Sequence, residues 1–270
     1  TGGLRHENVT AVLAGDQPGQ PGVGSFGGGP QRVDVETLAA LPSGGAPEDR
    51  IRTSGVVSLA AGRDGAHFAG TTSGLFRHAA DGSELGLDAH VDGDAGSIGA
   101  GYVSALLPAG DDLWVGVGGS GLFRRDAATG RFASFRHDPA VPGSLSGDYI
   151  TALHDGPDGR LWVGTRSNGL NRCSVAPFTC ERFDGRHAGT PNLGHHHVTA
   201  LRADGSGGLW VATSGGGLRR AQPGDDGRVR GFEAGEPARD CRCVDCRRRN
   251  RARDANFVHC FRVVGEGLSR

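Results

Sequence analysis

The sequence contains no methionine and no lysine, and all 29 of its basic residues are arginine. The missing initiator methionine indicates a processed or truncated chain, so we expect a fragment of a longer protein. No apolar run approaches the length of about 18 residues that a membrane-spanning helix needs. The N-terminus has no basic segment followed by an apolar core, so no signal peptide is visible. A formal net charge of −1 argues against polyanion binding, and nucleic acid is not an expected partner.

Cysteine is scarce, whereas glycine is abundant. Six cysteines in 270 residues do not constitute the disulfide framework of a small secreted domain. The 49 glycines and 13 prolines favour many turns over long helices.

The sequence has no serine nucleophile elbow and no zincin motif, and its glycine runs are typical of turns rather than phosphate-binding loops. We therefore expect this chain not to be an enzyme, and we expect no bound cofactor.

A Gly-Leu-x-Arg signature recurs at a nearly constant spacing. Successive copies lie 47, 48, 48 and 50 residues apart, and a weaker copy begins at Gly29. The clear copies begin at Gly74, Gly121, Gly169, Gly217 and Gly267. A tryptophan lies seven residues before three of these glycines, and Phe68 takes the equivalent place six residues before Gly74. These aromatic residues are Phe68, Trp114, Trp162 and Trp210. We interpret the tryptophans as core residues that fill the gap between neighbouring repeats.

Each repeat contains about four short apolar segments separated by turns, and no convincing helix. In one full copy the predicted strands are 150–154, 160–164, 169–173 and 179–183. A four-stranded sheet that repeats in this way is the signature of a β-propeller blade. We therefore predict an all-β propeller with five complete blades. Their approximate bounds are 9–42, 56–92, 103–137, 150–186 and 198–235.

The sixth repeat is disrupted. Gly267 falls on the period, but the segment 240–253 carries cysteine and arginine where the first strands of a blade should lie. We therefore divide the chain into propeller blades at 1–235 and a disrupted sixth blade at 236–270, and we expect an incomplete ring. The favoured hypothesis for the disrupted segment is a non-native sequence, produced by misread GC-rich coding DNA or by decay of one repeat.

Two other interpretations of this segment stay open. The stretch 247–253 is rich in arginine and resembles a nucleic-acid or targeting patch. A zinc site is the second alternative, although only one cysteine pair has the spacing typical of a zinc knuckle. The residues that such a site would use are Cys241, Cys243, Cys246, His259 and Cys260.

Four segments of one repeat together carry a family resemblance. They are H-D-P at 137–139, G-S-L-S at 143–146, I-T-A-L at 150–153 and G-R-L-W-V-G-T at 159–165. This pattern resembles the two-component regulator propeller repeat over about residues 1–235. The resemblance implies the extracytoplasmic, periplasmic sensor region of a hybrid histidine kinase or a diguanylate cyclase. It also implies rings of commonly seven blades, downstream signalling modules that this sequence lacks, and a dimer in the full-length receptor.

Cys173 and Cys180 flank the predicted turn between strands 169–173 and 179–183. Opposed positions of a hairpin can bring two Cβ atoms to the separation that a disulfide needs. In an oxidising periplasm we expect a structural bridge between them. Two half-buried, reduced thiols are the alternative.

Polar residues gather in the connections at one end of the predicted blades. In an up-and-down blade, the turn between the second and third strands and the connection to the next blade emerge at the same end. A polar rim around a channel mouth is where we expect a ligand. The histidines at 195–197 stand in one such connection, and we favour a surface loop over a metal site for them. The candidate ligand-binding residues are Arg52, Asp148, Arg166, Asn168, His195, His196 and Ser214.

The sequence therefore predicts a non-catalytic, ligand-sensing propeller that binds a small molecule or a glycan. One alternative is a propeller enzyme, such as a lyase or a quinoprotein, which would need an acid–base pair and a metal in the channel. A second alternative is a protein-interaction scaffold, which would carry an apolar patch on one rim.

Overall fold

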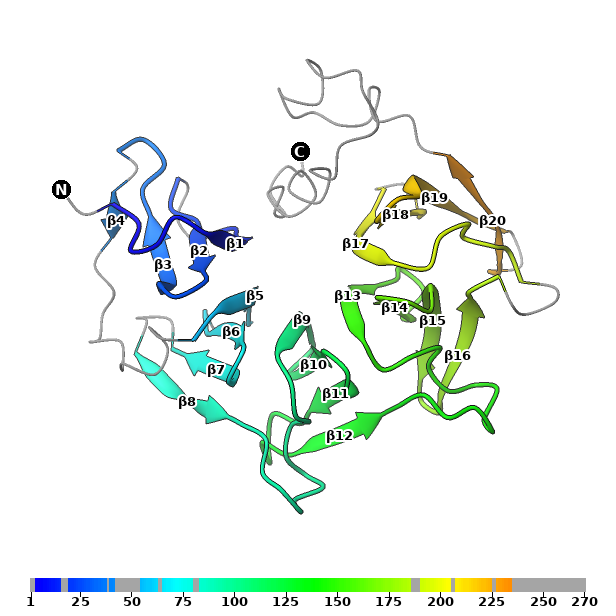
Figure 1. Ribbon diagram of the computed structural model, residues 1–270, viewed down its shortest axis with the longest axis horizontal. Helices are drawn as coiled ribbons and strands as arrows, with labels where there is room; N and C mark the ends of the chain where they lie inside the picture. Colours follow the sequence, from blue (N-terminus) through cyan, green and yellow to red (C-terminus); the bar gives the residue numbers. More distant parts are fainter. Residues whose placement is uncertain are drawn as a thin grey trace. The chain divides into compact units, whose positions relative to one another are not determined.

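The computed structural model describes residues 3–15, 19–37, 39–41, 54–62, 65–79, 83–185, 190–204, 207–224 and 227–234. Within these ranges the chain forms twenty strands and no helix, in five four-stranded antiparallel sheets (Figure 1). In every sheet the strands follow one another in sequence order, as a propeller blade requires. The predicted all-β blade architecture is confirmed. No helix in the described part of the chain is long and apolar enough to cross a membrane.

The strands group into two compact units that divide after Phe135. The first unit holds three blades. Their strands are β1 (Val9–Leu13), β2 (Gly22–Ser25), β3 (Gly29–Val33) and β4 (Ala40–Leu41); β5 (Val56–Ala61), β6 (His67–Thr71), β7 (Gly74–His78) and β8 (Glu84–Asp88); and β9 (Val103–Ala109), β10 (Asp112–Val117), β11 (Gly121–Arg125) and β12 (Phe132–Phe135).

The second unit holds two blades. Their strands are β13 (Ile150–Asp155), β14 (Leu161–Thr165), β15 (Leu170–Val175) and β16 (Phe178–Phe183); and β17 (Val198–Ala203), β18 (Leu209–Thr213), β19 (Gly217–Pro223) and β20 (Val229–Ala234). The predicted sixth blade, 236–270, lies outside the described residues, and so do the cysteines and histidine of the alternative zinc site.

The tryptophan of the repeat and the arginine of its Gly-Leu-x-Arg signature are cross-strand partners. Trp162 pairs with Arg172 in β14 and β15, and the guanidinium carbon lies 5.5 Å from the ring centroid. Arg172 also forms an ion pair with Asp158, in the turn between β13 and β14. The same arrangement recurs as Trp114 with Arg124 and as Trp210 with Arg220. The fixed spacing in the sequence therefore sets one hairpin register, which brings a cation onto an aromatic face in the three blades that carry the tryptophan.

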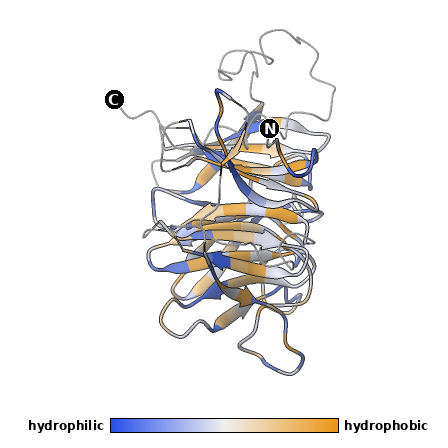
Figure 2. Ribbon diagram, turned by 90° about the vertical axis from the view of Figure 1, so that its left-hand side faces the viewer, coloured by the Kyte–Doolittle hydropathy of each residue, from blue (hydrophilic) through white to orange (hydrophobic). Residues whose placement is uncertain are grey.

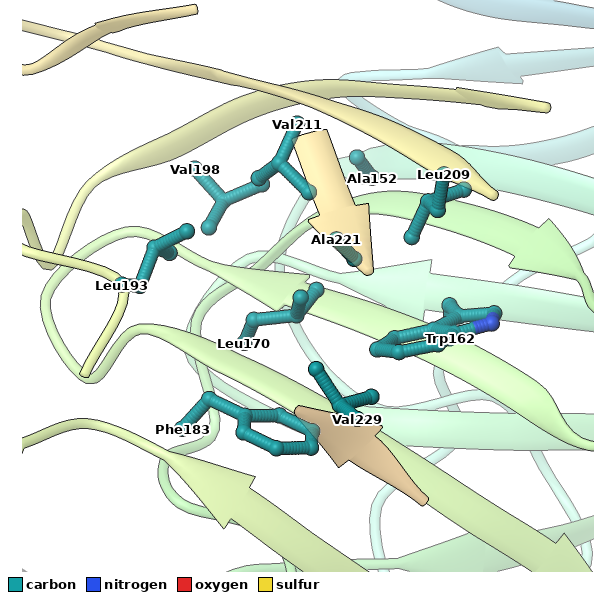
Figure 3. Packing of buried hydrophobic residues seen from close by; sticks show 10 residues of the cluster. All are labelled: Ala152, Trp162, Leu170, Phe183, Leu193, Val198, Leu209, Val211, Ala221 and Val229. Carbon is teal, nitrogen blue, oxygen red and sulfur yellow. The ribbon is translucent and has the colours of Figure 1, made fainter. Parts of the chain in front are cut away.

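Apolar residues are concentrated on the strands (Figure 2), and those between β13–β16 and β17–β20 form one core cluster. One blade contributes Trp162, Leu170 and Phe183, and the next contributes Val198 and Val211 among others (Figure 3). Because side chains alternate across a strand, each blade presents one apolar face to its neighbour. Leu170 and Val198 are fully buried there, so the blades exclude water from the interface.

Close approach between neighbouring blades depends on a glycine in the second strands β6 and β14. A Cβ at Gly164 would lie 2.5 Å from Val198 Cγ1. A Cβ at Gly70 would lie 2.5 Å from Val103 Cγ1, in the interface between β5–β8 and β9–β12. Any larger residue would push the next inner strand away, which explains the Gly or Ala that follows the Trp-Val pair in the sequence.

The H-D-P and G-S-L-S motifs form the connection that precedes β13. The ring Nδ1 of His137 donates to the Leu145 carbonyl at 2.6 Å. The backbone N–H of Asp138 donates to Ser144 Oγ at 2.9 Å. The buried guanidinium of Arg182 donates through Nε to the Ser144 carbonyl at 2.8 Å. The motif residues and Arg182 therefore satisfy one another's polar groups, and the two motifs serve the folding of this loop.

Candidate ligand-binding face

Six of the seven predicted site residues belong to the second unit, and Arg52 lies outside the described residues. They occur in the β14–β15 turn, in the β18–β19 turn and in the two connections that lead into β13 and β17. In these antiparallel sheets all four segments emerge at the same end of their blades. The backbone arrangement therefore agrees with the expected rim.

Arg166 opens the β14–β15 turn and lies against Tyr149, the residue that precedes β13. The Arg166 N–H donates to the Tyr149 carbonyl at 2.9 Å, and the guanidinium Nη1 donates to the Tyr149 hydroxyl at 3.1 Å. The guanidinium carbon is 4.9 Å from the tyrosine ring centroid. Arg166 is exposed, so its remaining donors face solvent. Among the described residues no carboxylate pairs with it. It is therefore a cation available to a ligand.

Backbone hydrogen bonds hold the histidine segment 195–197 against the β14–β15 turn and the β18–β19 turn. The carbonyl of His196 accepts the Gly169 N–H at 2.8 Å, and the carbonyl of His197 accepts the Ser214 N–H at 2.9 Å. The His195 ring packs against the β18–β19 turn, because a Cβ at Gly215 would lie 2.9 Å from His195 Nε2. The structure thus brings the β14–β15 turn, the histidines and the β18–β19 turn together.

His197 is a half-buried member of this group that sequence reasoning did not select. Burial lowers the pKa of His197 below the ordinary value, and the nearby Arg166 and His195 lower it further. The His197 N–H donates to His195 Nδ1 at 3.4 Å, which places the proton of a neutral His195 on Nε2. The signal was present in the sequence, because His197 and Tyr149 both directly precede an inner strand.

Asp148 and Asn168 contribute differently from the expectation. The Asp148 carboxylate accepts the His137 N–H at 2.6 Å and pairs with Arg136 at 3.4 Å, so both oxygens hold the preceding loop. The Asn168 side chain packs against Gly147, where a Cβ would lie 2.5 Å from Asn168 Oδ1. These two residues shape the face, while Arg166, Tyr149 and the histidines supply its charge and donors.

The chemistry of this face is that of a binding surface rich in hydrogen-bond donors. A guanidinium, a phenol, imidazoles and the exposed Ser214 hydroxyl suit the oxygen atoms of a polar ligand. Across the described ranges of the chain, no cluster of three His, Cys, Asp or Glu residues is arranged to hold a metal ion.

A disulfide joins Cys173 and Cys180 at the other end of the β13–β16 blade. The two residues are direct partners in the β15–β16 register, with Cα atoms 4.0 Å apart. Cys173 is fully buried, and the bridge crosses only the β15–β16 turn. Its position supports a structural role.

Comparisons with known proteins identify the repeat. Residues 144–167 match the family described as two component regulator propeller, which confirms the resemblance. None of the curated proteins matches the chain. The fold resembles the extracellular domain of a hybrid two component system assigned in B. thetaiotaomicron, with a TM-score of 0.65 and 16% identity over 86% of this chain and 29% of that one.

Two further solved structures show the same fold. One is the extracellular domain of a one component system assigned in B. thetaiotaomicron, with a TM-score of 0.60 and 18% identity over 80% of this chain and 28% of that one. The other is a chain of the mitotic checkpoint complex, with a TM-score of 0.58 and 17% identity over 84% of this chain and 64% of that one. The present chain thus spans less than a third of the two extracellular domains.

Proposed function

We propose, on the premise that residues 144–167 form a two component regulator propeller repeat, that these blades belong to a periplasmic ligand-sensing region. The receptor would be a two-component or cyclic-di-GMP signalling protein, and this region would bind its ligand without catalysis. The fold shared with two extracellular domains of B. thetaiotaomicron signalling systems supports this proposal. The Cys173–Cys180 disulfide also supports it, because structural disulfides persist in oxidising compartments.

The convergence of Arg166, Tyr149 and the histidines is the observation that carries the proposed binding site. Three segments distant in sequence meet there through backbone hydrogen bonds, so the donors are held in place before a ligand arrives. Preorganised donors reduce the entropic cost of binding. A small polar molecule or a glycan, which offers several oxygen acceptors, is the class of ligand that fits them.

A binding screen with one matched pair of variants tests the proposal. The purified chain is titrated by calorimetry with a panel of neutral and acidic mono- and oligosaccharides and small carboxylates. Arg166→Gln is expected to weaken binding of any hit by about tenfold or more, since a hydrogen bond to a charged group contributes about 1.5–3 kcal/mol. Arg160→Gln is the control, because Arg160 is an exposed arginine at the other end of the same blade. Equal affinities for the two variants would argue against this face.

The periplasmic location of the protein is tested in a separate experiment. Cells that express the natural gene are fractionated, and the protein is detected with an antibody raised against this chain. The proposal expects the blades to be accessible to protease in spheroplasts, where the periplasm is open. Protection of the blades until the cytoplasmic membrane is lysed would contradict a periplasmic sensor.

A further inference from the structure

The variable residue of the Gly-Leu-x-Arg signature has a structural role in the first four blades. In the β1–β4 blade, where the signature is weaker, Gln31 Oε1 accepts the Arg5 N–H at 2.8 Å. In the β13–β16 blade, Asn171 Oδ1 accepts the Ser146 N–H at 2.8 Å. Both N–H groups belong to the segment that leads into the blade, so the amide joins that segment to the third strand. The equivalent residues of the other two blades are Phe76 and Phe123, which are buried.

Arg219 holds this position in the β17–β20 blade, and its side chain has no such role. An arginine side chain has no acceptor atom. The N–H of Gly194, which is the equivalent of Ser146, donates to Asn192 Oδ1 at 2.8 Å instead. The Arg219 Nε is buried without a hydrogen-bond partner, and no carboxylate of the described residues pairs with the guanidinium. Arg219 is therefore a second cation of this unit, besides Arg166, that no anion of the described chain compensates.

The Arg219 guanidinium lies at the candidate ligand-binding face. Its Nη2 is 3.5 Å from the place that a Cβ would take at Gly194, the exposed residue directly before the histidine segment. Arg166 lies near the other end of that segment, close enough to lower the pKa of His197. Gly194 and His197 are three residues apart, so the chain holds their Cα atoms within about 11 Å. The two guanidinium groups therefore flank one short segment of the face.

The charge on this face is positive and permanent. A guanidinium group cannot lose its proton in a protein. The Asp148 carboxylate is already engaged by Arg136 and by the His137 N–H. Asp184, which follows β16, is 5% exposed and pairs with neither Arg166 nor Arg219. A buried N–H of a cation without a partner is unfavourable. A ligand with negatively charged oxygens would compensate both guanidinium groups, and their planar forks match carboxylates.

We propose that the ligand of this face is an anion, whose negatively charged groups are held by Arg166 and Arg219 at the two ends of the histidine segment. This inference rests on the proposed binding function and narrows its class of ligand. It favours acidic saccharides and dicarboxylates over neutral sugars. Arg219 is then a specificity-determining residue, at a position where the other blades carry an amide or a phenylalanine.

Matched probes that differ only in charge test the class of ligand. The purified chain is titrated by calorimetry with oligogalacturonate and its neutral methyl ester, and with succinate and neutral succinamide. At least one acidic probe is expected to bind about tenfold or more tightly than its neutral partner, and the two pairs distinguish an acidic glycan from a small dicarboxylate. The affinity should fall between about 0.05 M and about 0.5 M sodium chloride, because salt screens exposed charges.

Variants of Arg219 test the residue. Arg219→Gln is expected to weaken binding of the acidic probe by about tenfold or more, as for the loss of a charged hydrogen bond. Arg219→Lys keeps the charge without the planar fork, so an intermediate affinity is expected. Arg160→Gln is again the control, because Arg160 is an exposed arginine at the other end of the β13–β16 blade, and its affinity should equal that of the parent chain.

The stability of the ligand-free chain separates a binding role from a structural one. Because the Arg219 guanidinium has no partner in the described chain, Arg219→Gln should leave the urea midpoint of unfolding unchanged or raise it. A lowered midpoint would show that the guanidinium holds the fold together, and it would overturn the inference.

The outcomes also separate this inference from the proposed function. Equal affinities for the acidic and neutral probes, with both weakened by Arg166→Gln, would overturn the inference alone, since the face would then bind a neutral ligand. Parent-like binding of the acidic probe by Arg219→Gln would do the same. An acidic probe that binds the parent chain and Arg166→Gln equally would overturn the binding face as well. Failure of every probe to bind would contradict both proposals.

Discussion

Arg172 lies directly opposite Trp162 in the β14–β15 pair, with its guanidinium over the indole ring and its charge paired with Asp158. The Arg172 side chain is only 8% exposed, so the Asp158 carboxylate compensates a positive charge that water barely reaches.

We expect Asp158→Asn to lower the free energy of unfolding by about 1–3 kcal/mol, because the hydrogen bond to a buried cation loses its ionic partner. Asp155→Asn is the control, since Asp155 is 74% exposed on the same blade and should change stability little. Urea denaturation of the two variants gives the comparison, and equal midpoints would contradict a stabilising role for the pair.

Gly164 in β14 sets the distance between its blade and the next one. Gly164→Ala places a methyl group 2.5 Å from Val198 Cγ1, so the next inner strand must move. We expect a loss of about 1–3 kcal/mol from overpacking, measured by denaturant unfolding. Gly231→Ala is the control, because a Cβ at Gly231 would meet nothing within 4 Å. A stable Gly164→Ala variant would mean that the blades have room to separate.

Thr151 and Thr199 occupy the same position in two inner strands, but only Thr151 has an acceptor among the described residues. Thr151→Val is expected to lower the stability of the chain by about 1 kcal/mol through loss of its hydrogen bond. Thr199→Val should leave the stability unchanged or raise it, because it removes a buried polar group without a partner. Thermal unfolding measures both. Destabilisation by Thr199→Val would show that its hydroxyl has a partner within the chain.

The disulfide can be detected directly. Trypsin cleaves after Arg172 and Arg182, so one peptide, 173–182, contains both cysteines. Without reduction this peptide should resist alkylation and weigh two hydrogen masses less than its reduced form. Replacing both cysteines by serine is expected to cost about 2–3 kcal/mol, since the closed loop is short. Alkylation of the unreduced peptide would show free thiols.

The depressed pKa of His197 gives a pH dependence with a definite sign. Burial is the main cause, and Arg166 and His195 add to it. A histidine whose folded pKa lies below its unfolded value of about 6.5 contributes stability above that value. That contribution is lost as the pH falls through the folded pKa. The stability of the parent chain relative to His197→Gln should therefore decline below about pH 6.5. A difference that is constant from neutral to acidic pH would contradict the assignment.

The repeat, the strands and the blades were predictable from the sequence because their determinants are local. Strand alternation, turn glycines and a fixed period define each blade, and the predicted strands 150–154 and 179–183 differ from β13 and β16 by one residue at one end. The constant distance between the tryptophan and the arginine of each repeat reflects a hairpin register, which is also a local property. The residues between blades follow from the same alternation.

Only the tertiary structure decided how the connections meet. Asp148 resembled a ligand-binding residue in the sequence, but its carboxylate holds the preceding loop. His197 was not selected, although backbone hydrogen bonds to two turns hold its segment against Arg166 and Ser214. The unpaired hydroxyl of Thr199 is likewise invisible in a sequence where Thr151 looks the same. The physical reason is common to all three cases: the role of a polar group depends on which partner reaches it, and that partner comes from another part of the chain.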